Sequence, residues 1–455
     1  MIAAVRSATV FGVEGRPVTV EVHVSTGLPA FQIVGLPDEA CRESRDRVRA
    51  AVLSSGLAWP SCRVTVNLAP SSQRKGGSGL DLAIAIGFLA ANQQVPVEQL
   101  EGLGFVGELG LDGSMRGVSG VAPMVLAMGD VRPVVPLASF REAQGVVGDG
   151  VRVAATLREV VDALNADEPW PRPPDTEFRD DEPPPPDLAD VRGQALARQG
   201  LEVAAAGSHH MLLVGPPGSG KTMLAQRIPG LLPALEHDVS LEATMVHSAA
   251  GVRLPAGGLV RRAPFRAPHH SSSMVSLVGG GSTSLRPGEI SLAHGGVLFL
   301  DELGEFAPSV LDGLRQPLEE GVIRLARARA SAALPARFLL VAATNPCPCG
   351  GGAPGVCECD DGARLRYLRR LSGPLLDRFD LRVGVARPEV DDLLAAGGGE
   401  PTVSVAERVA AARQRSLDRI GMATAHMPAA QLDALAPLHP DARARLRDQL
   451  ERDQL

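Results

Sequence analysis

The stretch Gly215-Pro216-Pro217-Gly218-Ser219-Gly220-Lys221-Thr222 decides the fold of this chain. It fits the pattern GxxxxGK[ST] and lies between the apolar residues 211–214 and a helical segment, which is the context that a phosphate-binding P-loop requires. Its glycines let backbone N–H groups turn toward phosphates. Lys221 is expected to reach the β- and γ-phosphates, and the Thr222 hydroxyl to bind Mg²⁺. The stretch therefore predicts an α/β P-loop ATPase whose cofactors are ATP and Mg²⁺.

Two further apolar runs end in polar residues suited to the same reaction. Residues 297–300 lead into Asp301 and Glu302, and residues 338–343 lead, one position later, into Asn345. Continuous apolar runs are typical of a parallel sheet that is covered on both faces. We expect Asp301 to hold the Mg²⁺ shell and Glu302 to position or deprotonate the attacking water. Asn345 is expected to orient that water and to sense the γ-phosphate.

Arg378 is the candidate for a further catalytic cation. It lies in the segment Leu375-Leu376-Asp377-Arg378-Phe379-Asp380. An ATP-hydrolysing P-loop motor needs a positive charge on the γ-phosphate, often from the neighbouring subunit. The alternative is a surface arginine that pairs with Asp377 or Asp380.

The length of 455 residues suggests several domains. Residues 1–165 alternate between strand and helix patterns, and residues 166–187 are rich in proline and acid, which predicts an extended linker. Residues 188–387 contain the ATPase motifs. Residues 388–455 are largely helical in pattern and are expected to form a C-terminal lid.

Composition and charge limit the partners. The net charge is −7, so any binding to nucleic acid depends on local basic patches. Lysine occurs only at Lys75 and Lys221, among 45 lysines and arginines, so the lysine in the P-loop is informative. No apolar run is long enough to span a bilayer and the N-terminus has no secretory pattern. A cytoplasmic protein with no membrane partner is expected.

Four of the six cysteines lie in two close pairs, Cys347-Pro348-Cys349 and Cys357-Glu358-Cys359. Four thiolates suit a tetrahedral, structural Zn²⁺ site, although this spacing is tighter than the usual CxxC. The alternative is a glycine-rich loop with unmetallated thiols. The other two cysteines, Cys41 and Cys62, are expected to be buried residues of the core.

Several ordered segments resemble one family, the ComM/YifB family of magnesium-chelatase-like AAA+ ATPases. Those segments are Asp190-Val191-Arg192-Gly193-Gln194, Pro264-Phe265-Arg266-Ala267-Pro268-His269-His270-Ser271, Pro287-Gly288-Glu289-Ile290-Ser291-Leu292-Ala293-His294, residues 297–302 and residues 371–380. The resemblance extends over nearly the whole chain.

This resemblance implies a homo-hexameric ring with ATP between subunits, acting on single-stranded or branched DNA. The family is linked to natural transformation, where a helicase-like motor is thought to promote branch migration. It also implies hairpins facing the ring pore, one before Asp301 and one at residues 322–334. Basic residues lie near both hairpins and would suit phosphate backbones, with a solvated basic face as the alternative. They are Arg261, Arg262, Arg266, His269 and His270, and Arg324, Arg327 and Arg329.

The N-terminal segment resembles the proteolytic domain of Lon-type proteases, which has an S5-like α/β fold. The matching segments are residues 75–81 and 107–113. A Ser–Lys protease needs a serine nucleophile and a lysine base. Alignment places Gly79 and Ala122 at those two positions, so the resemblance implies a non-proteolytic domain.

Family members continue with a helix whose Ser-x-Arg segment supplies a second cation at the nucleotide. This sequence ends at Leu455, so an incomplete, truncated lid is expected, in which Arg443 or Arg445 could substitute. Two other functions stay open. One is an ATPase subunit of a true magnesium chelatase, against which residues 1–165 argue. The other is an ATP-gated DNA-binding scaffold that hydrolyses poorly.

Overall fold

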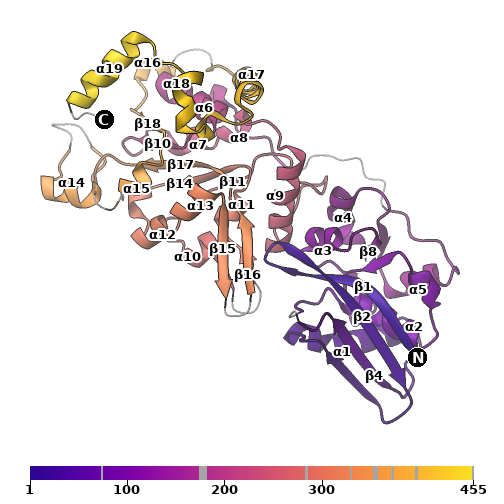
Figure 1. Ribbon diagram of the computed structural model, residues 1–455. Coiled ribbons are helices and arrows are strands. Elements are labelled where there is room, and N and C mark those ends of the chain that lie inside the picture. Colours follow the sequence, from indigo (N-terminus) through magenta and orange to yellow (C-terminus); the bar gives the residue numbers. More distant parts are fainter. Residues whose placement is uncertain are drawn as a thin grey trace. The chain divides into compact units, whose positions relative to one another are not determined.

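The computed structural model describes residues 1–72, 75–173, 182–281, 285–327, 330–351, 357–368, 370, 373–394 and 398–452. The fold is mixed α/β, as the sequence predicts, and the chain forms two compact units (Figure 1). The first unit comprises Met1–Pro184, Ala234–Leu300 and Glu305–Phe338; the second comprises Pro185–Pro233, Asp301–Gly304 and Leu339–Leu455. The chain first passes between the units after Pro184, inside the segment that the sequence predicts as a linker; residues 174–181 of that segment lie outside the described residues.

The N-terminal part of the first unit is built on a seven-stranded sheet with the order β3-β4-β2-β1-β5-β8-β9. Its strands are β1 (Ile2–Phe11), β2 (Glu14–Ser25), β3 (Ala30–Val34), β4 (Arg63–Ala69), β5 (Leu103–Phe105), β8 (Arg132–Pro136) and β9 (Arg152–Ala154), and a separate short pair is β6 (Glu108–Leu109) with β7 (Met115–Arg116). The pairs β1–β2 and β2–β4 are antiparallel, and the other neighbours are parallel. In β2 the buried Val18, Val20 and Val22 alternate with exposed residues, the period of two that a half-buried strand requires.

Helices cover both faces of this sheet. They are α1 (Glu39–Ser54), α2 (Asp81–Ala91), α3 (Val121–Ala127), α4 (Phe140–Val147) and α5 (Leu157–Leu164). The first two helices and α5 share one apolar core, whereas α3 and α4 share a second. Every residue of α2 is buried. Gly87 allows its close approach to the sheet, because a Cβ there would lie 2.7 Å from a Val22 methyl group.

An ion pair joins α1 to the first turn of α2. Arg47 donates to the carboxylate of Asp81 through Nε at 2.7 Å and Nη2 at 3.1 Å. The Asp81 side chain is fully buried, and its carboxylate also accepts the backbone N–H of Leu109 at 3.3 Å. A buried carboxylate held by several donors fixes the position of α2 against its neighbours.

The rest of the first unit contains short helices and two small hairpins. Its elements are α9 (His237–Ala250), β11 (Phe265–Arg266), α10 (Met274–Val278), β12 (Gly279–Gly280), β13 (Arg286–Pro287), α11 (Glu289–Leu292), β14 (Val297–Leu300), α12 (Pro308–Asp312), α13 (Arg315–Glu320), β15 (Val322–Arg327) and β16 (Ala330–Pro335). The strands β15 and β16 pair as an antiparallel hairpin, which confirms the hairpin expected at residues 322–334, and β12 pairs with β13 ahead of Asp301. Helix α9 contacts α3, where the N–H of Gly120 donates to the Ser248 carbonyl at 3.0 Å.

The second unit carries three parallel strands in the order β17-β10-β18. Its elements are α6 (Ala195–Gly207), β10 (Met211–Val214), α7 (Lys221–Ala225), α8 (Ile228–Leu231), β17 (Leu339–Thr344), α14 (Asp361–Leu368), α15 (Gly373–Leu376), β18 (Leu381–Gly384), α16 (Val390–Leu394), α17 (Thr402–Ile420), α18 (Ala429–Leu435) and α19 (Pro440–Glu451). Short 3₁₀ helices occur along the whole chain, beginning with two in the first unit. They lie at Val97–Leu100, Leu137–Ser139, Leu188–Asp190, Leu303–Glu305 and Thr424–His426. The C-terminal region is helical, as expected, and its longest helix, α17, packs against α6 and α8 (Figure 1).

Replacing Asp81 by alanine should destabilise the N-terminal core by about 3 kcal/mol, because the partly buried guanidinium of Arg47 loses its buried partner. The two tryptophans of the chain, Trp59 and Trp170, both pack against this core, so their fluorescence reports its unfolding in urea.

The control is Glu43→Ala, which removes the exposed partner of Arg47 at 3.4 Å and should cost under about 0.5 kcal/mol. Equal urea midpoints for Asp81→Ala and the parent chain would show that the buried pair does not stabilise α2.

Candidate functional site

The predicted P-loop leaves the end of β10 and turns into α7, and glycine is required at three of its positions. Gly218 and Gly220 have φ values of 74° and 89°, in the left-handed region that side chains disfavour. A Cβ on Gly215 would lie 2.1 Å from the carbonyl oxygen of Val385. The loop therefore takes a path that only glycine allows, with its carbonyl groups turned toward the following lysine.

Lys221 lies at the start of α7 and is only 8% exposed. Its ammonium donates to the carbonyl oxygens of Gly215 at 2.7 Å and Pro216 at 2.9 Å, and to the Asn345 side-chain oxygen at 3.2 Å. Burial lowers the pKa of Lys221, and the charges of nearby Asp301 and Glu302 offset part of that shift. Because these three acceptors are neutral, the positive charge is left to attract a phosphate.

The two acidic residues after β14 lie beside the P-loop. The hydroxyl of Thr222 donates to the Asp301 carboxylate at 2.6 Å, and the other Asp301 oxygen accepts the N–H of Glu302 at 2.9 Å. Glu302 itself has a φ of 52°, an uncommon conformation for a residue with a side chain. Such backbone strain is often found at functional sites.

A divalent cation fits these oxygens. Mg²⁺ binds oxygen ligands at about 2.0–2.1 Å in an octahedron, so neighbouring ligands lie roughly 2.9 Å apart. The Thr222 and Asp301 oxygens are 2.6 Å apart at the phosphate-binding loop, close to that spacing. These two residues are therefore suited to hold Mg²⁺, as the sequence predicts.

Asn345 follows β17 and meets the P-loop through Lys221. Strand β17 lies beside β10 with Val214 opposite Thr344, so the two strands end level with each other. The hydroxyls of Thr344 and Tyr367 lie 3.1 Å apart, which ties the end of β17 to α14.

Together these residues line a cavity of about 440 Å³ in the second unit. The lining residues are Pro217, Gly218, Ser219, Gly220, Lys221, Thr222, Met223, Asp301, Glu302, Ala343, Thr344 and Asn345. The structure thus brings the P-loop, the acidic pair and Asn345 to one place. Arg378, exposed in the turn that follows α15, is not among these lining residues, and neither are the exposed Arg443 and Arg445 of α19.

One residue near the cavity received no role from the sequence. The Gln194 amide donates to the carbonyl oxygens of Ser219 at 3.2 Å and Ala386 at 2.5 Å. It thereby connects the P-loop to the segment after β18. Its presence in one of the family segments was a signal, but the partners 25 and 192 residues away were not predictable.

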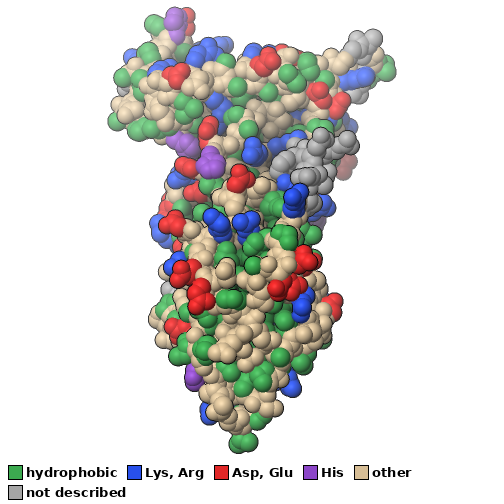
Figure 2. Space-filling model, turned by 90° about the vertical axis from the view of Figure 1, so that its right-hand side faces the viewer, with side chains coloured by type: hydrophobic (Ala, Val, Ile, Leu, Met, Phe, Trp, Pro, Cys, Tyr) green, Lys and Arg blue, Asp and Glu red, His purple; other side chains and the backbone are tan. Residues whose placement is uncertain are grey.

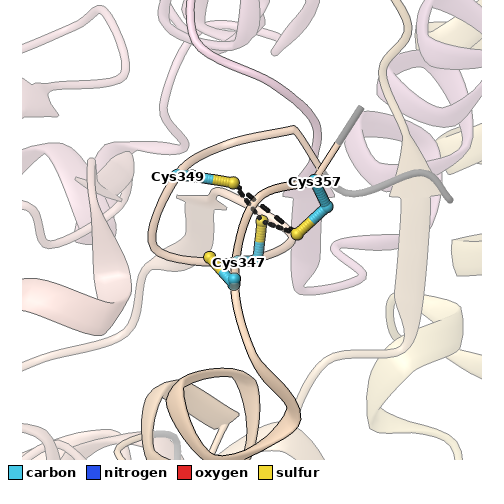
Figure 3. A group of neighbouring side chains, drawn as sticks. Cys347, Cys349 and Cys357 are labelled. Carbon is cyan, nitrogen blue, oxygen red and sulfur yellow. Dashed lines mark hydrogen bonds between the residues drawn. The ribbon is translucent and has the colours of Figure 1, made fainter. Parts of the chain in front are cut away.

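The four clustered cysteines also come together. The sulfurs of Cys347, Cys349 and Cys357 lie 3.4–3.6 Å apart and point toward one another (Figure 3). With Cys359 they form a group whose sulfurs all lie within 4.8 Å. Hydrogen bonding from the N–H of Gly351 lowers the pKa of the Cys349 thiol to about 6. Cys41 is buried, as expected, whereas Cys62 is partly exposed.

The basic residues singled out in the sequence differ in their surroundings. Arg266 forms a bidentate salt bridge with Glu289, with N–O distances of 2.6 and 2.8 Å. Arg324 forms a salt bridge with Glu320 at 3.1 Å. The rings of His269 and His270 lie against each other. Arg329 and the side chain of Arg327 lie outside the described residues. On the face drawn in Figure 2, basic and acidic side chains are interspersed.

The N-terminal residues that could suggest a Ser–Lys pair have separate partners. The buried Lys75 donates through Nζ to the carbonyl oxygen of Pro70, whereas the Ser78 hydroxyl donates to the Glu108 carboxylate. The two side chains are thus held by different groups.

Comparison with known proteins identifies the family. Three family models match: "Magnesium chelatase, subunit ChlI" over residues 187–393, "Subunit ChlI of Mg-chelatase" over residues 20–136, and "Magnesium chelatase, subunit ChlI C-terminal" over residues 399–455. The chain is 43% identical to "Competence protein ComM" of Haemophilus influenzae, covering 95% of this chain and 86% of that protein. It is 44% identical to "Uncharacterized protein YifB" of Escherichia coli, covering 92% and 83%. The chain belongs to the ComM/YifB family of magnesium-chelatase-like AAA+ ATPases.

Two further relatives complete the comparison, one more similar to this chain and one more distant. An "Uncharacterized protein Rv2897c" of Mycobacterium tuberculosis is 50% identical over 91% of this chain and 82% of its own length. A shorter match, 26% identical over 38% of this chain and 21% of the relative, is to "Probable DNA helicase MCM9" of rice. Membership of the ComM/YifB family implies an ATPase that uses ATP and Mg²⁺. Among the described residues, no helix is both long and apolar enough to cross a membrane.

Two variants of the cavity should separate nucleotide binding from hydrolysis. Lys221→Ala removes the cation for the phosphates and should abolish ATP binding, whereas Glu302→Gln should keep ATP bound and stop turnover, because an amide cannot accept the proton. Binding of a fluorescent ATP analogue and phosphate release measure the two effects. Tight binding by Lys221→Ala, or normal hydrolysis by Glu302→Gln, would place the site elsewhere.

Proposed function

We propose that this chain is a Mg²⁺-dependent, ATP-hydrolysing ring motor that acts on DNA. Its role would be helicase activity or branch migration during natural transformation or recombination. One observation carries the ATPase part of this proposal, namely that Lys221, Thr222, Asp301, Glu302 and Asn345 line a single cavity. A cation, a metal-binding pair, a base and an amide are the groups that phosphoryl transfer to water requires.

Each residue has a distinct task in this proposal. Lys221 balances charge on the β- and γ-phosphates, and Glu302 accepts a proton from the attacking water. Asn345 orients that water through its amide, while its carbonyl oxygen stays with the Lys221 ammonium. Bound at Thr222 and Asp301, Mg²⁺ would neutralise phosphate charge.

Action on DNA is supported by the relatives and by the hairpins. One relative is named a competence protein, and a more distant one a probable DNA helicase. The strand pairs β12–β13 and β15–β16 lie in the two segments where the family resemblance implies hairpins. In a homo-hexameric ring these would track single-stranded or branched DNA mainly through its phosphate backbone.

A second candidate is the ATPase subunit of a magnesium chelatase, because the matching family models carry that name even over residues 20–136. The high identity to ComM and YifB over more than nine-tenths of the chain favours the DNA motor. A third candidate is a DNA-binding scaffold that is gated by ATP and turns it over poorly.

DNA should stimulate ATP hydrolysis severalfold, and branched DNA should be migrated in an ATP-dependent way. Phosphate release is measured with no DNA, with single strands and with a synthetic four-way junction, with Glu302→Gln as the inactive control. Stimulation should weaken as salt rises from 50 to 200 mM, the range over which roughly 10³-fold in affinity is lost when about six phosphates are contacted.

The alternatives give different results in the same assay. DNA-independent hydrolysis that supports Mg²⁺ insertion into a tetrapyrrole would favour the chelatase. DNA binding that depends on ATP but proceeds without turnover would favour the scaffold. Either result would contradict the motor.

Arg378 is proposed to act on the nucleotide of the neighbouring subunit. Arg378→Ala should leave ATP binding intact and reduce hydrolysis by about 10³-fold, the scale of an arginine finger. The matched control is Arg382→Ala, an exposed arginine nearby that donates to the Leu376 carbonyl and should stay active.

Mixing Arg378→Ala with Lys221→Ala protein tests the direction of this action. The first variant keeps an intact cavity and the second keeps Arg378, so mixed rings should regain part of the activity. If no ratio restores hydrolysis, Arg378 does not act between subunits.

A further inference from the structure

The cysteine cluster has the dimensions of a site for a single metal ion. Four sulfurs bound at 2.3 Å around a tetrahedral Zn²⁺ would lie about 3.8 Å apart. Three of the separations here are 3.4, 3.4 and 3.6 Å, and all four sulfurs lie within 4.8 Å of one another. The same distances are far longer than the roughly 2.05 Å of a disulfide. The four thiols are therefore already gathered as a mononuclear site would need them.

The identity of the metal follows from the ligands. Four thiolates in a tetrahedron suit zinc or an iron–sulfur centre. In a four-iron cluster each iron takes one cysteine, so the cluster itself holds the thiolates apart, whereas these sulfurs leave room for one ion. A closed set of four cysteines without an open position is the pattern of a structural zinc site rather than a catalytic one.

Groups around the sulfurs suit a negatively charged centre. The N–H of Gly351 donates to the Cys349 sulfur at 3.4 Å, and the positively charged Arg364 lies close to Cys357. Four thiolates around Zn²⁺ carry a net charge of about −2, which such donors and an adjacent cation stabilise.

We propose that Cys347, Cys349, Cys357 and Cys359 bind one structural Zn²⁺, and that the metal-bound loop is a clamp holding Asn345 against the P-loop. The cysteines act through Asn345 in this scheme, so they are positioning residues for the amide that orients the water. The effect on turnover rests on the proposed ATPase function, but the presence of the metal does not.

The clamp is argued from two contacts of the loop. At one end, Cys347 lies two residues after Asn345, whose side-chain oxygen is 3.2 Å from the Lys221 ammonium. In the middle, Gly350 lies so close to the P-loop that a Cβ would be 2.4 Å from Pro217 Cδ and 2.8 Å from Cγ. Gly350 also has a φ of 77°, and its N–H donates to the Cys347 carbonyl at 2.9 Å.

These contacts make the cysteine loop a bridge between two walls of the cavity. Because the ring of Pro217 meets Gly350 directly, a shift of the loop would be transmitted to the P-loop. Because Cys347 is 1% exposed and joined to Asn345 by one proline, its anchoring also limits the movement of that amide. Loss of the metal should therefore disturb hydrolysis more than binding.

The metal is tested by elemental analysis of the full chain purified without chelators, which should contain about one Zn²⁺ per chain. Replacing Cys357 and Cys359 by serine should reduce zinc to below about a tenth of an equivalent, because two ligands are lost. The matched control is Cys62→Ser, a cysteine outside the cluster, which should keep its zinc. Less than about a tenth of an equivalent in the parent chain, or iron in place of zinc, would overturn the assignment.

The clamp is tested by separating binding from turnover. In the zinc-free double variant the affinity for ATP should stay within about threefold while kcat falls by about tenfold, the scale seen when partners of metal ligands are lost. The variant Gly350→Ala should retain zinc. It should still lower kcat, because the added methyl group would collide with the ring of Pro217. Unchanged kcat in both variants, with full zinc in Gly350→Ala, would overturn the clamp and leave the metal site standing.

If the parent chain hydrolyses no ATP, the clamp can still be tested by measuring amide hydrogen exchange. Removal of zinc should then speed exchange at residues 345–351 with ATP bound, relative to the Cys62→Ser control. Unchanged exchange there would contradict the clamp, and the absence of turnover would contradict the proposed function alone.

Discussion

The ammonium group of Lys221, held in the interior by neutral oxygens, is the interaction on which the nucleotide cavity depends. Its acceptors are the carbonyls of Gly215 and Pro216 and the amide oxygen of Asn345. Two of these face inward because the P-loop follows a glycine-only path through Gly218 and Gly220. The backbone conformation of the loop thus positions the Lys221 ammonium. Because its acceptors are neutral oxygens, the positive charge remains available to bind a phosphate.

The third acceptor depends on strand register. In the parallel pair of β10 and β17, Leu213 lies opposite Ala343 and Val214 opposite Thr344. The P-loop and Asn345 therefore leave the sheet at the same level, and a slip of one residue would turn every side chain of a strand to the other face. All six residues of β17 are buried. A slip would therefore cost free energy at the ends of the strand, where it would exchange buried residues with the residues that flank them. Apolar burial in the sheet is thus what fixes a polar contact in the cavity.

Sequence alone predicts the parts of this site that are local. The P-loop, the acidic pair after β14 and Asn345 are each read from a strand and the residues that directly follow it, and the cavity brings them together. Contacts between distant residues escape such reasoning. Gln194 bonds to Ala386, and Gly350 meets Pro217, across separations that no spacing rule covers.

The basic residues show the same limit. The sequence suggests that Arg266 contacts phosphate, but in the structure its guanidinium forms a bidentate salt bridge with Glu289. A helix that begins at Glu289 supplies this partner, and only the fold brings the two together. The hairpin at β15 and β16, by contrast, needs only local pairing and is found where it was expected. Long-range side-chain pairing, rather than secondary structure, is what the sequence could not give.

The composition of the loop after Asn345 explains why cysteines are placed there. Residues 346–359 read PCPCGGGAPGVCEC and offer few large apolar side chains, so burial in a core can contribute little to ordering this loop beyond Cys347. Its glycines make ordering still more costly in backbone entropy, yet it connects to the residue that touches Lys221. A metal bound by side chains supplies free energy for ordering without any apolar surface. The proposed Zn²⁺ site would therefore stabilise this loop at a place where the hydrophobic effect contributes little.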